Sequence, residues 1–160
     1  MKATTPEEAL AQTLVRFRSE GSDHISCSQA VTLFSLLVLG DDPDLAVAAQ
    51  YLGGGLAGMG ETCGALTGAA VALGLRSVCH GQESEDATPT ATEFLQQLVR
   101  DFEREFGSRR CFDLTGFDLS DPEQREAFFA SDIRPRCQDY VTWSCKRLTP
   151  FLLGADSPRS

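Results

Sequence analysis

Small residues recur along one side of a predicted helix in the middle of the chain, and they limit how that helix can pack. Gly60, Gly64 and Gly68 stand four residues apart, with alanines between them, in a segment that we expect to be helical from Glu61 to Leu75. Each glycine costs a helix about 1 kcal/mol relative to alanine. Three in register therefore indicate a bare face that a second helix, or a second sulfur-bearing side chain, approaches closely.

Helical signals mark the rest of the chain, without the alternation of apolar and polar residues that is typical of strands. Thr5-Pro6-Glu7-Glu8 offers the residues of a capping box, and Asp23 or Ser26 can cap the second, strongly apolar helix. We expect helices over approximately residues 5–20, 26–39, 44–52, 61–75, 91–106, 121–128 and 136–153. The predicted fold is all-α: a single-domain bundle of about six to seven helices over 1–154, with a polar loop over 82–90 and a flexible tail over 155–160.

Charge and hydropathy exclude several classes of partner. The formal net charge of -9 argues against nucleic acid and against anionic lipid, because both bind clustered Lys and Arg. The longest apolar run, Val31 to Leu39, is too short to span a bilayer. The first eight residues lack the apolar core of a signal peptide. We therefore expect a cytoplasmic protein that binds neither nucleic acid nor membrane, and the small-residue face suits a homodimer.

Six cysteines in such a protein indicate thiol chemistry or metal binding, because permanent disulfides are uncommon in a reducing compartment. Cys27 and Cys63 are both expected in the first turn of a helix. Unpaired backbone N–H groups there favour a thiolate, and we expect a lowered thiol pKa at both positions. The alternative for each cysteine taken alone is a small buried hydrophobic residue.

For several other residues and motifs, a structural role is a simpler interpretation than a functional one. His24 is close enough in sequence to tune Cys27 or to act as a ligand, but a solvated loop histidine is the simpler interpretation. Cys79-His80 is not a haem attachment site, because Arg76 stands where the first cysteine of Cys-x-x-Cys-His belongs. Cys145 lies in an apolar stripe and is expected in the core. The glycines of 53–60 follow no predicted strand and lead to no Gly-Lys-Ser/Thr, so they form no phosphate loop.

Four segments together resemble the family of putative redox-active proteins named after the cysteine pattern C-GCAxxG-C-C. The segments are Cys27-Ser-Gln-Ala-Val31, Gly60-Glu-Thr-Cys-Gly-Ala-Leu-Thr-Gly-Ala69, Phe106-Gly-Ser-Arg-Arg-Cys111 and Arg136-Cys137-Gln-Asp-Tyr-Val141. The resemblance implies that Cys27, Cys63, Cys111 and Cys137 are the four family cysteines, with Gly64, Ala65 and Gly68 packing around the site. One departure is the order Cys63-Gly64, where the pattern has glycine before cysteine.

Three hypotheses follow from these residues. The first is reversible thiol–disulfide chemistry, with Cys27 and Cys63 as the reactive pair and Cys111 and Cys137 as candidate partners, acting on an unidentified redox partner. The second is a metal ion or iron–sulfur cluster held by the same four cysteines, which match a four-thiolate ligand set. The third is a non-enzymatic helical interaction protein. No established substrate or electron donor comes with the resemblance.

Overall fold

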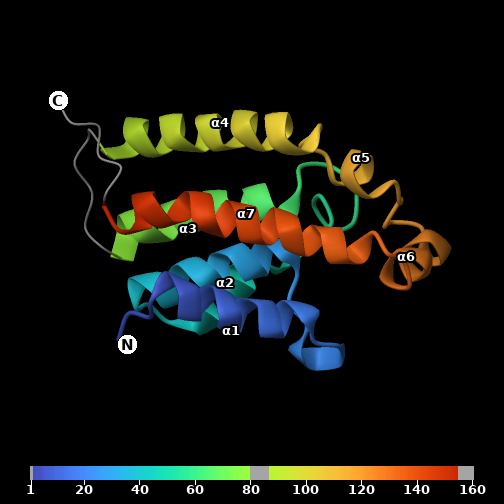
Figure 1. Ribbon diagram of the computed structural model, residues 1–160, viewed down its shortest axis with the longest axis horizontal. Helices are drawn as coiled ribbons and strands as arrows, with labels where there is room; N and C mark the ends of the chain where they lie inside the picture. Colours follow the sequence, from blue (N-terminus) through green and yellow to red (C-terminus); the bar gives the residue numbers. More distant parts are fainter. Residues whose placement is uncertain (1, 80–86, 155–160) are drawn as a thin grey trace.

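The computed structural model describes residues 2–79 and 87–154, and in this part of the chain the fold is all-α, as predicted (Figure 1). The described chain contains seven α-helices and two 3-10 helices, η1 and η2. Their bounds are α1 Pro6–Arg18, η1 Gly21–Asp23, α2 Cys27–Leu39, η2 Pro43–Leu52, α3 Gly64–Cys79, α4 Ala87–Phe106, α5 Cys111–Thr115, α6 Pro122–Phe129 and α7 Arg134–Leu152.

Capping boxes begin the first two α-helices at the predicted places. The Thr5 side chain accepts a hydrogen bond from the Glu8 backbone N–H at the start of α1, and the Glu8 carboxylate accepts from Thr5 in return. At the start of α2, the Ser26 hydroxyl accepts from the Gln29 N–H, while the Ser26 N–H donates to Gln29 Oε1. Two of the four unpaired N–H groups at each helix end are thereby satisfied, which fixes where each helix begins.

Helix α2 is the centre of the bundle. It packs against α1, η2, α3 and α7, and its apolar side chains Leu33, Phe34 and Leu36 are almost completely buried. Its buried hydroxyls are paired: Thr32 and Ser35 each donate to the carbonyl four residues earlier. The apolar sequence of this helix is therefore explained by burial on nearly all sides.

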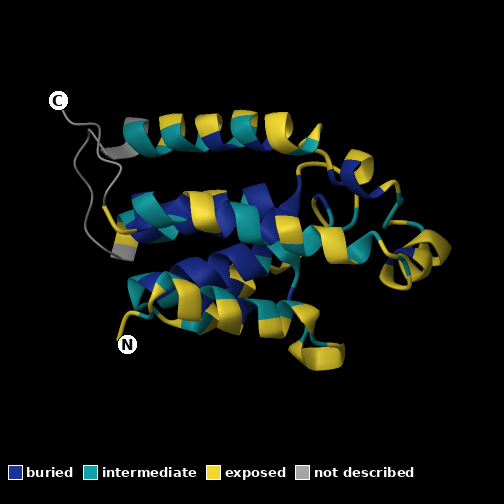
Figure 2. Cartoon of the chain, in the orientation of Figure 1, coloured by how far each residue is buried: buried dark blue, intermediate teal, exposed yellow. Residues whose placement is uncertain are grey.

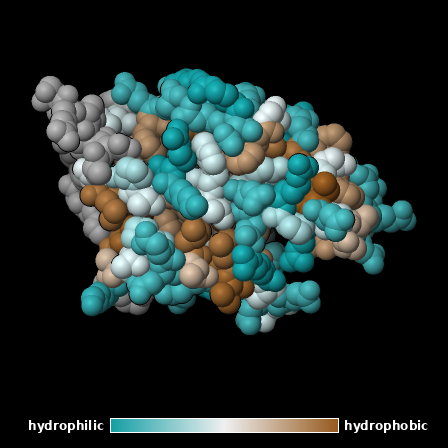
Figure 3. All heavy atoms as spheres, in the orientation of Figure 1, coloured by the Kyte–Doolittle hydropathy of each residue, from teal (hydrophilic) through white to brown (hydrophobic). Residues whose placement is uncertain are grey.

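The helices form layers in Figure 1, with α4 on one side, α3 and α7 in the middle, and α2 and α1 on the other side. Helix α4 contacts only α3 and α7 strongly, and it turns a buried stripe inward and exposed residues outward (Figure 2). Hydrophilic side chains cover its outer face in Figure 3. Its inner face places Phe102 and Phe106 against the rings of Tyr140 and Trp143 of α7.

One predicted helix type and two predicted boundaries are corrected by the structure. The helix predicted over 44–52 is the 3-10 helix η2. Helix α3 begins at Gly64 rather than Glu61, so Cys63 precedes the helix and Gly60 lies in the loop before it. Helix α4 begins at Ala87, inside the segment predicted as a polar loop over 82–90, whose remaining residues 82–86 lie outside the described residues, as does the predicted tail. None of the helices described over 2–79 and 87–154 is long and apolar enough to cross a membrane.

Candidate functional site

The N-termini of two helices meet at Cys27. Cys27 is the first residue of α2, and Gly64 is the first residue of α3. The backbone N–H groups of Cys27, Ser28, Gly54 and Gly64 lie near the Cys27 sulfur, and each favours its thiolate form. Helix starts carry partial positive charge, so this sulfur lies where two such charges converge.

The start of α2 can approach α3 this closely because the residues that face it are glycines, which have no Cβ atom. A Cβ atom on Gly64 would overlap Cys27 Sγ, and one on Gly68 would overlap the Ser28 backbone. A Cβ atom on Gly53 would lie 2.6 Å from the Cβ of Ser26. The small-residue face predicted from Gly64 and Gly68 therefore serves close packing against the start of α2.

Gly60 has a different role from the one predicted. It lies before α3 with a φ of +74°, a left-handed conformation that favours glycine, and a Cβ there would stand 2.9 Å from the Cβ of Phe112. Gly60 is therefore a turn residue that packs closely against Phe112 of α5, rather than part of a helical face.

Backbone hydrogen bonds hold Cys63 beside Cys111, although 48 positions separate them in the sequence numbering. The Cys63 N–H donates to the Arg109 carbonyl at 2.8 Å, and the Cys111 N–H donates to the Glu61 carbonyl at 2.7 Å. An isolated antiparallel bridge between Thr62 and Arg110 lies between these two bonds. The segment before α3 is thus fastened to the start of α5.

The four cysteines of the motif lie at or near the first residues of α2, α3, α5 and α7, which begin at the same end of the bundle (Figure 1). Cys137 lies in the first turn of α7. A charge on Cys27 would raise the thiol pKa of Cys63, Cys111 and Cys137, and charges on Cys111 and Cys137 would raise that of Cys63. The tertiary structure therefore gathers the residues that the resemblance singled out.

The expected lowering of the thiol pKa is not found. Burial raises the pKa of Cys27, although its four backbone N–H contacts oppose the shift. Burial, followed by repulsion from Cys27, raises the pKa of Cys63 well above its usual range and that of Cys111 to about 12. Burial likewise raises the pKa of Cys137. Desolvation outweighs the helix ends here, so the resting cluster is a set of neutral thiols.

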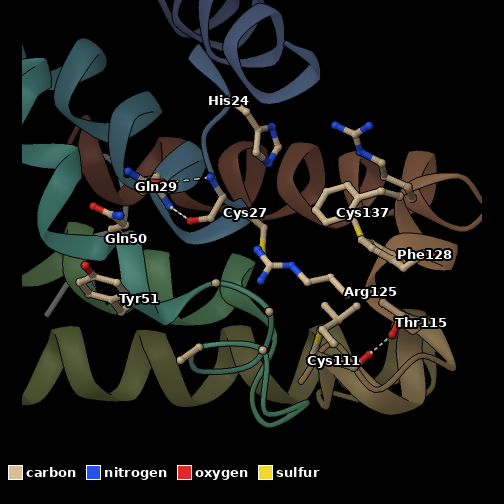
Figure 4. A pocket seen from close by; sticks show the side chains of 18 of the residues that line it. His24, Cys27, Gln29, Gln50, Tyr51, Cys111, Thr115, Arg125, Phe128 and Cys137 are labelled. Carbon is tan, nitrogen blue, oxygen red and sulfur yellow. Dashed lines mark hydrogen bonds between the residues drawn. The ribbon is translucent and has the colours of Figure 1, made fainter. Parts of the chain in front are cut away.

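A pocket of about 470 Å³ opens beside three of these sulfurs (Figure 4). Cys27, Cys111 and Cys137 line it, whereas Cys63 does not and is 5% exposed. Cys63 is therefore buried outside the pocket lining, whereas the other three cysteines face the pocket. This volume is in the range of small-molecule sites.

His24 lines the same pocket and is not a solvated loop residue. It is half-buried between the rings of Phe17 and Phe129, and its Nδ1 lies 3.1 Å from the Phe17 carbonyl oxygen. Because a carbonyl only accepts, Nδ1 carries the proton in the neutral ring and Nε2 carries a lone pair. Burial and the nearby charge of Arg134 lower the pKa of His24, so the ring is neutral near pH 7.

A resident metal does not fit this arrangement. Among the described residues, no three Cys, His, Asp or Glu side chains lie close enough together to hold a metal ion. The predicted metal or iron–sulfur site at Cys27, Cys63, Cys111 and Cys137 is therefore not confirmed.

Cys145 is completely buried in the core, as predicted, and burial raises its pKa. Cys79 is the last residue of α3, and His80 lies outside the described residues. Sequence reasoning missed the pocket residues Arg125 and Arg134, because an arginine on an expected helix gives no local signal that distinguishes a pocket residue from a solvated one.

Comparison with known proteins gives one informative match. A model of the family described as "Putative redox-active protein (C_GCAxxG_C_C)" matches residues 25–150, a range that contains all four cysteines of the motif. No curated protein matches the chain, and no solved structure does. The resemblance predicted from the cysteine segments is confirmed.

Proposed function

Since this chain belongs to the C_GCAxxG_C_C family of putative redox-active proteins, we propose that it performs reversible thiol–disulfide exchange with Cys27 and Cys63 as the reacting pair. One observation supports the proposal: Cys27 faces the pocket and packs against Gly64, the residue that follows the buried Cys63, and a charge on Cys27 raises the pKa of Cys63. Thiol–disulfide exchange requires an accessible thiol that can attack the substrate and a second thiol that can attack the resulting mixed disulfide.

Cys27 is the attacking thiol. Four backbone N–H groups near its sulfur favour a thiolate, whereas the Ala65 N–H favours a thiolate at Cys63. Thiolates are the nucleophiles in exchange, so the better-stabilised and accessible sulfur reacts first. Neutral His24, in the same pocket, is suited to take up the proton at Nε2.

Cys63 is the resolving thiol. The Cys27 thiolate attacks an incoming disulfide R–S–S–R, forms a mixed disulfide and releases one thiolate, which takes up a proton. Cys63 then attacks the Cys27 sulfur and releases the second thiol. The protein pair loses two electrons and two protons, and the incoming disulfide gains them.

Cys111 and Cys137 are alternative resolving thiols. Both line the pocket, and both sulfurs are coupled to Cys27. In the absence of Cys63 they remain close enough to the reaction to intercept a mixed disulfide, although they lie on other helices.

Redox titration followed by mass spectrometry tests this proposal. The reduced protein is equilibrated with mixtures of a thiol and its disulfide, the remaining thiols are alkylated, and each cysteine is assigned by peptide mapping. We expect one pair, Cys27 with Cys63, to be oxidised together as a two-electron couple. In Cys63→Ser, the mixed disulfide at Cys27 should be resolved more slowly and only through Cys111 or Cys137, and it should accumulate when these two cysteines are also replaced by serine.

Cys145→Ala is the matched control, because Cys145 is a buried thiol on α7 that lies outside the coupled cluster. It should leave the titration unchanged. A protein that keeps Cys27 and Cys63 reduced across the whole series, while its circular dichroism stays that of the folded state, would overturn the proposal.

A further inference from the structure

The pocket beside the cysteines has a charge opposite to that of the chain as a whole. The chain carries 23 acidic and 14 basic residues, yet none of the described residues that line the pocket is Asp or Glu. Arg125 and Arg134 do line it and carry its positive charge, since His24 is neutral near pH 7. A concave site with one sign of charge raises the local concentration of ligands of the opposite sign.

The positive charges of the two arginines can bind an anionic ligand. Within residues 2–79 and 87–154, no carboxylate lies within ion-pair distance of Arg125 or Arg134. Arg134 lies over the ring of Phe129, 5.0 Å from its centroid, and this contact holds the side chain at the pocket wall. Arg125 extends across the pocket toward Cys27 in the view of Figure 4. A guanidinium binds carboxylates through two parallel N–H···O bonds, which favours that ligand class.

Polar and apolar groups complete a site for a small molecule. Gln29, Gln50 and Tyr51 provide hydrogen-bonding groups at one side, and Phe128 provides an apolar wall at the other. The sulfurs of Cys27, Cys111 and Cys137 face the same space. A ligand held by the arginines would thus have its centre next to reactive thiols.

We propose that the pocket binds a low-molecular-weight disulfide that carries carboxylates, with Arg125 and Arg134 holding the carboxylates and Cys27 receiving the sulfur. This inference rests on the proposed exchange function and names its substrate class. Cys27 forms a disulfide with one half of the substrate, and the other half leaves as a carboxylate-bearing thiol. Attack by Cys63 then releases the second half as the same kind of thiol, so one substrate disulfide is reduced to two thiols.

A charge series of small disulfides tests the substrate class. Dithiodiglycolate is anionic, hydroxyethyl disulfide is neutral and cystamine is cationic, and the three are similar in size. The rate of mixed-disulfide formation at Cys27 is measured by mass spectrometry and divided by the rate with free mercaptoethanol. We expect the anionic disulfide to be favoured over the cationic one by at least about tenfold, corresponding to about 1.4 kcal/mol. The net charge of -9 alone would give the opposite order.

Arginine variants identify the source of the preference. Arg125→Gln and Arg134→Gln should each reduce it several-fold. Arg136→Gln, which removes the same charge from an exposed residue of α7 outside the pocket, should leave it unchanged.

The outcomes separate this inference from the function on which it rests. Exchange with all three disulfides at equal normalised rates, or fastest with cystamine, overturns the substrate class and leaves the exchange function intact. A preference that survives both pocket substitutions also overturns it. Reaction with none of the disulfides overturns both proposals together.

Discussion

Cys27 Sγ occupies the space that a Cβ atom on Gly64 would need, so the first residues of α2 and α3 touch directly. This contact brings the N–H groups of two helices to one sulfur. The reactivity of Cys27 therefore depends on how closely α2 and α3 pack.

Replacing Gly64 should disturb both stability and the site. Gly64→Ala adds a methyl group that overlaps Cys27 Sγ and lies 3.0 Å from the Ser28 nitrogen, so we expect a loss of about 1–3 kcal/mol in the free energy of unfolding. Gly74→Ala is the control on the same helix, since nothing lies within 4 Å of its added Cβ. It should stabilise by about 0.5–1 kcal/mol. Urea unfolding measures both; equal effects would contradict the close contact.

The two capping boxes should be equivalent for stability but not for reactivity. Ser26→Ala and Thr5→Ala should each cost about 1 kcal/mol in urea unfolding, because each removes a side-chain acceptor at a helix start. Only Ser26→Ala should also change the alkylation rate of Cys27, the next residue in the chain. Thr5→Ala, at the far end of α1, serves as the control. An unchanged Cys27 rate in a folded Ser26→Ala protein would show that the cap does not position the thiol.

Alkaline pH should destabilise the fold through its buried thiols. Burial raises the pKa of Cys111 to about 12, whereas an unfolded thiol titrates near about 8.5. The folded state therefore holds the proton to higher pH than the unfolded chain. Its contribution is complete below the unfolded pKa and declines as pH rises from there toward the folded pKa, by up to about 1.4 kcal/mol per pH unit for each thiol.

Urea midpoints at a series of pH values from neutral upward test this prediction. The Cys111→Ala protein should lose less stability per pH unit than the unsubstituted protein, because other alkaline groups titrate in both. Parallel curves would mean that the Cys111 pKa is ordinary in the folded state.

Glycine should stabilise one exposed position and destabilise another. Ala57 has a φ of +51° in the loop beside the pocket, a left-handed conformation that costs a non-glycine residue about 1 kcal/mol. Ala57→Gly should therefore leave stability unchanged or raise it by up to about 1 kcal/mol. Ala70→Gly, at an exposed position in α3, should lower it by about 1 kcal/mol. Two losses of the same size in thermal unfolding would contradict the loop conformation.

The single tryptophan should report the docking of α4. Trp143 lies edge-to-face against Phe102, with ring centroids 5.5 Å apart, and Phe102 is fully buried. Phe102→Ala should cost about 3–5 kcal/mol and shift Trp143 emission toward longer wavelengths. Phe102→Leu, which keeps most of the volume, is the milder variant and should lose less. Unaltered emission in a folded Phe102→Ala protein would contradict this contact.

Local sequence determined the helices, because capping and periodicity act within a few residues. The capping hydroxyls of Thr5 and Ser26, and the apolar run of α2, specify their helices without reference to the rest of the chain. The same local reasoning placed Cys27 at a helix start. It failed at Cys63, because the bond from the Cys63 N–H to the Arg109 carbonyl keeps the preceding segment extended and delays α3 to Gly64.

The tertiary structure decided the chemistry of the site. The cysteine pattern identified Cys27, Cys63, Cys111 and Cys137 as a set, but only the folded bundle places Cys27, Cys111 and Cys137 around one pocket and buries Cys63 outside its lining. Burial reverses the expected sign of the pKa shifts, because desolvation depends on all the surrounding atoms and not on the helix end alone. The pocket arginines also depend on the tertiary structure. Arg125 and Arg134 line one pocket only because the fold places α6 and α7 around it.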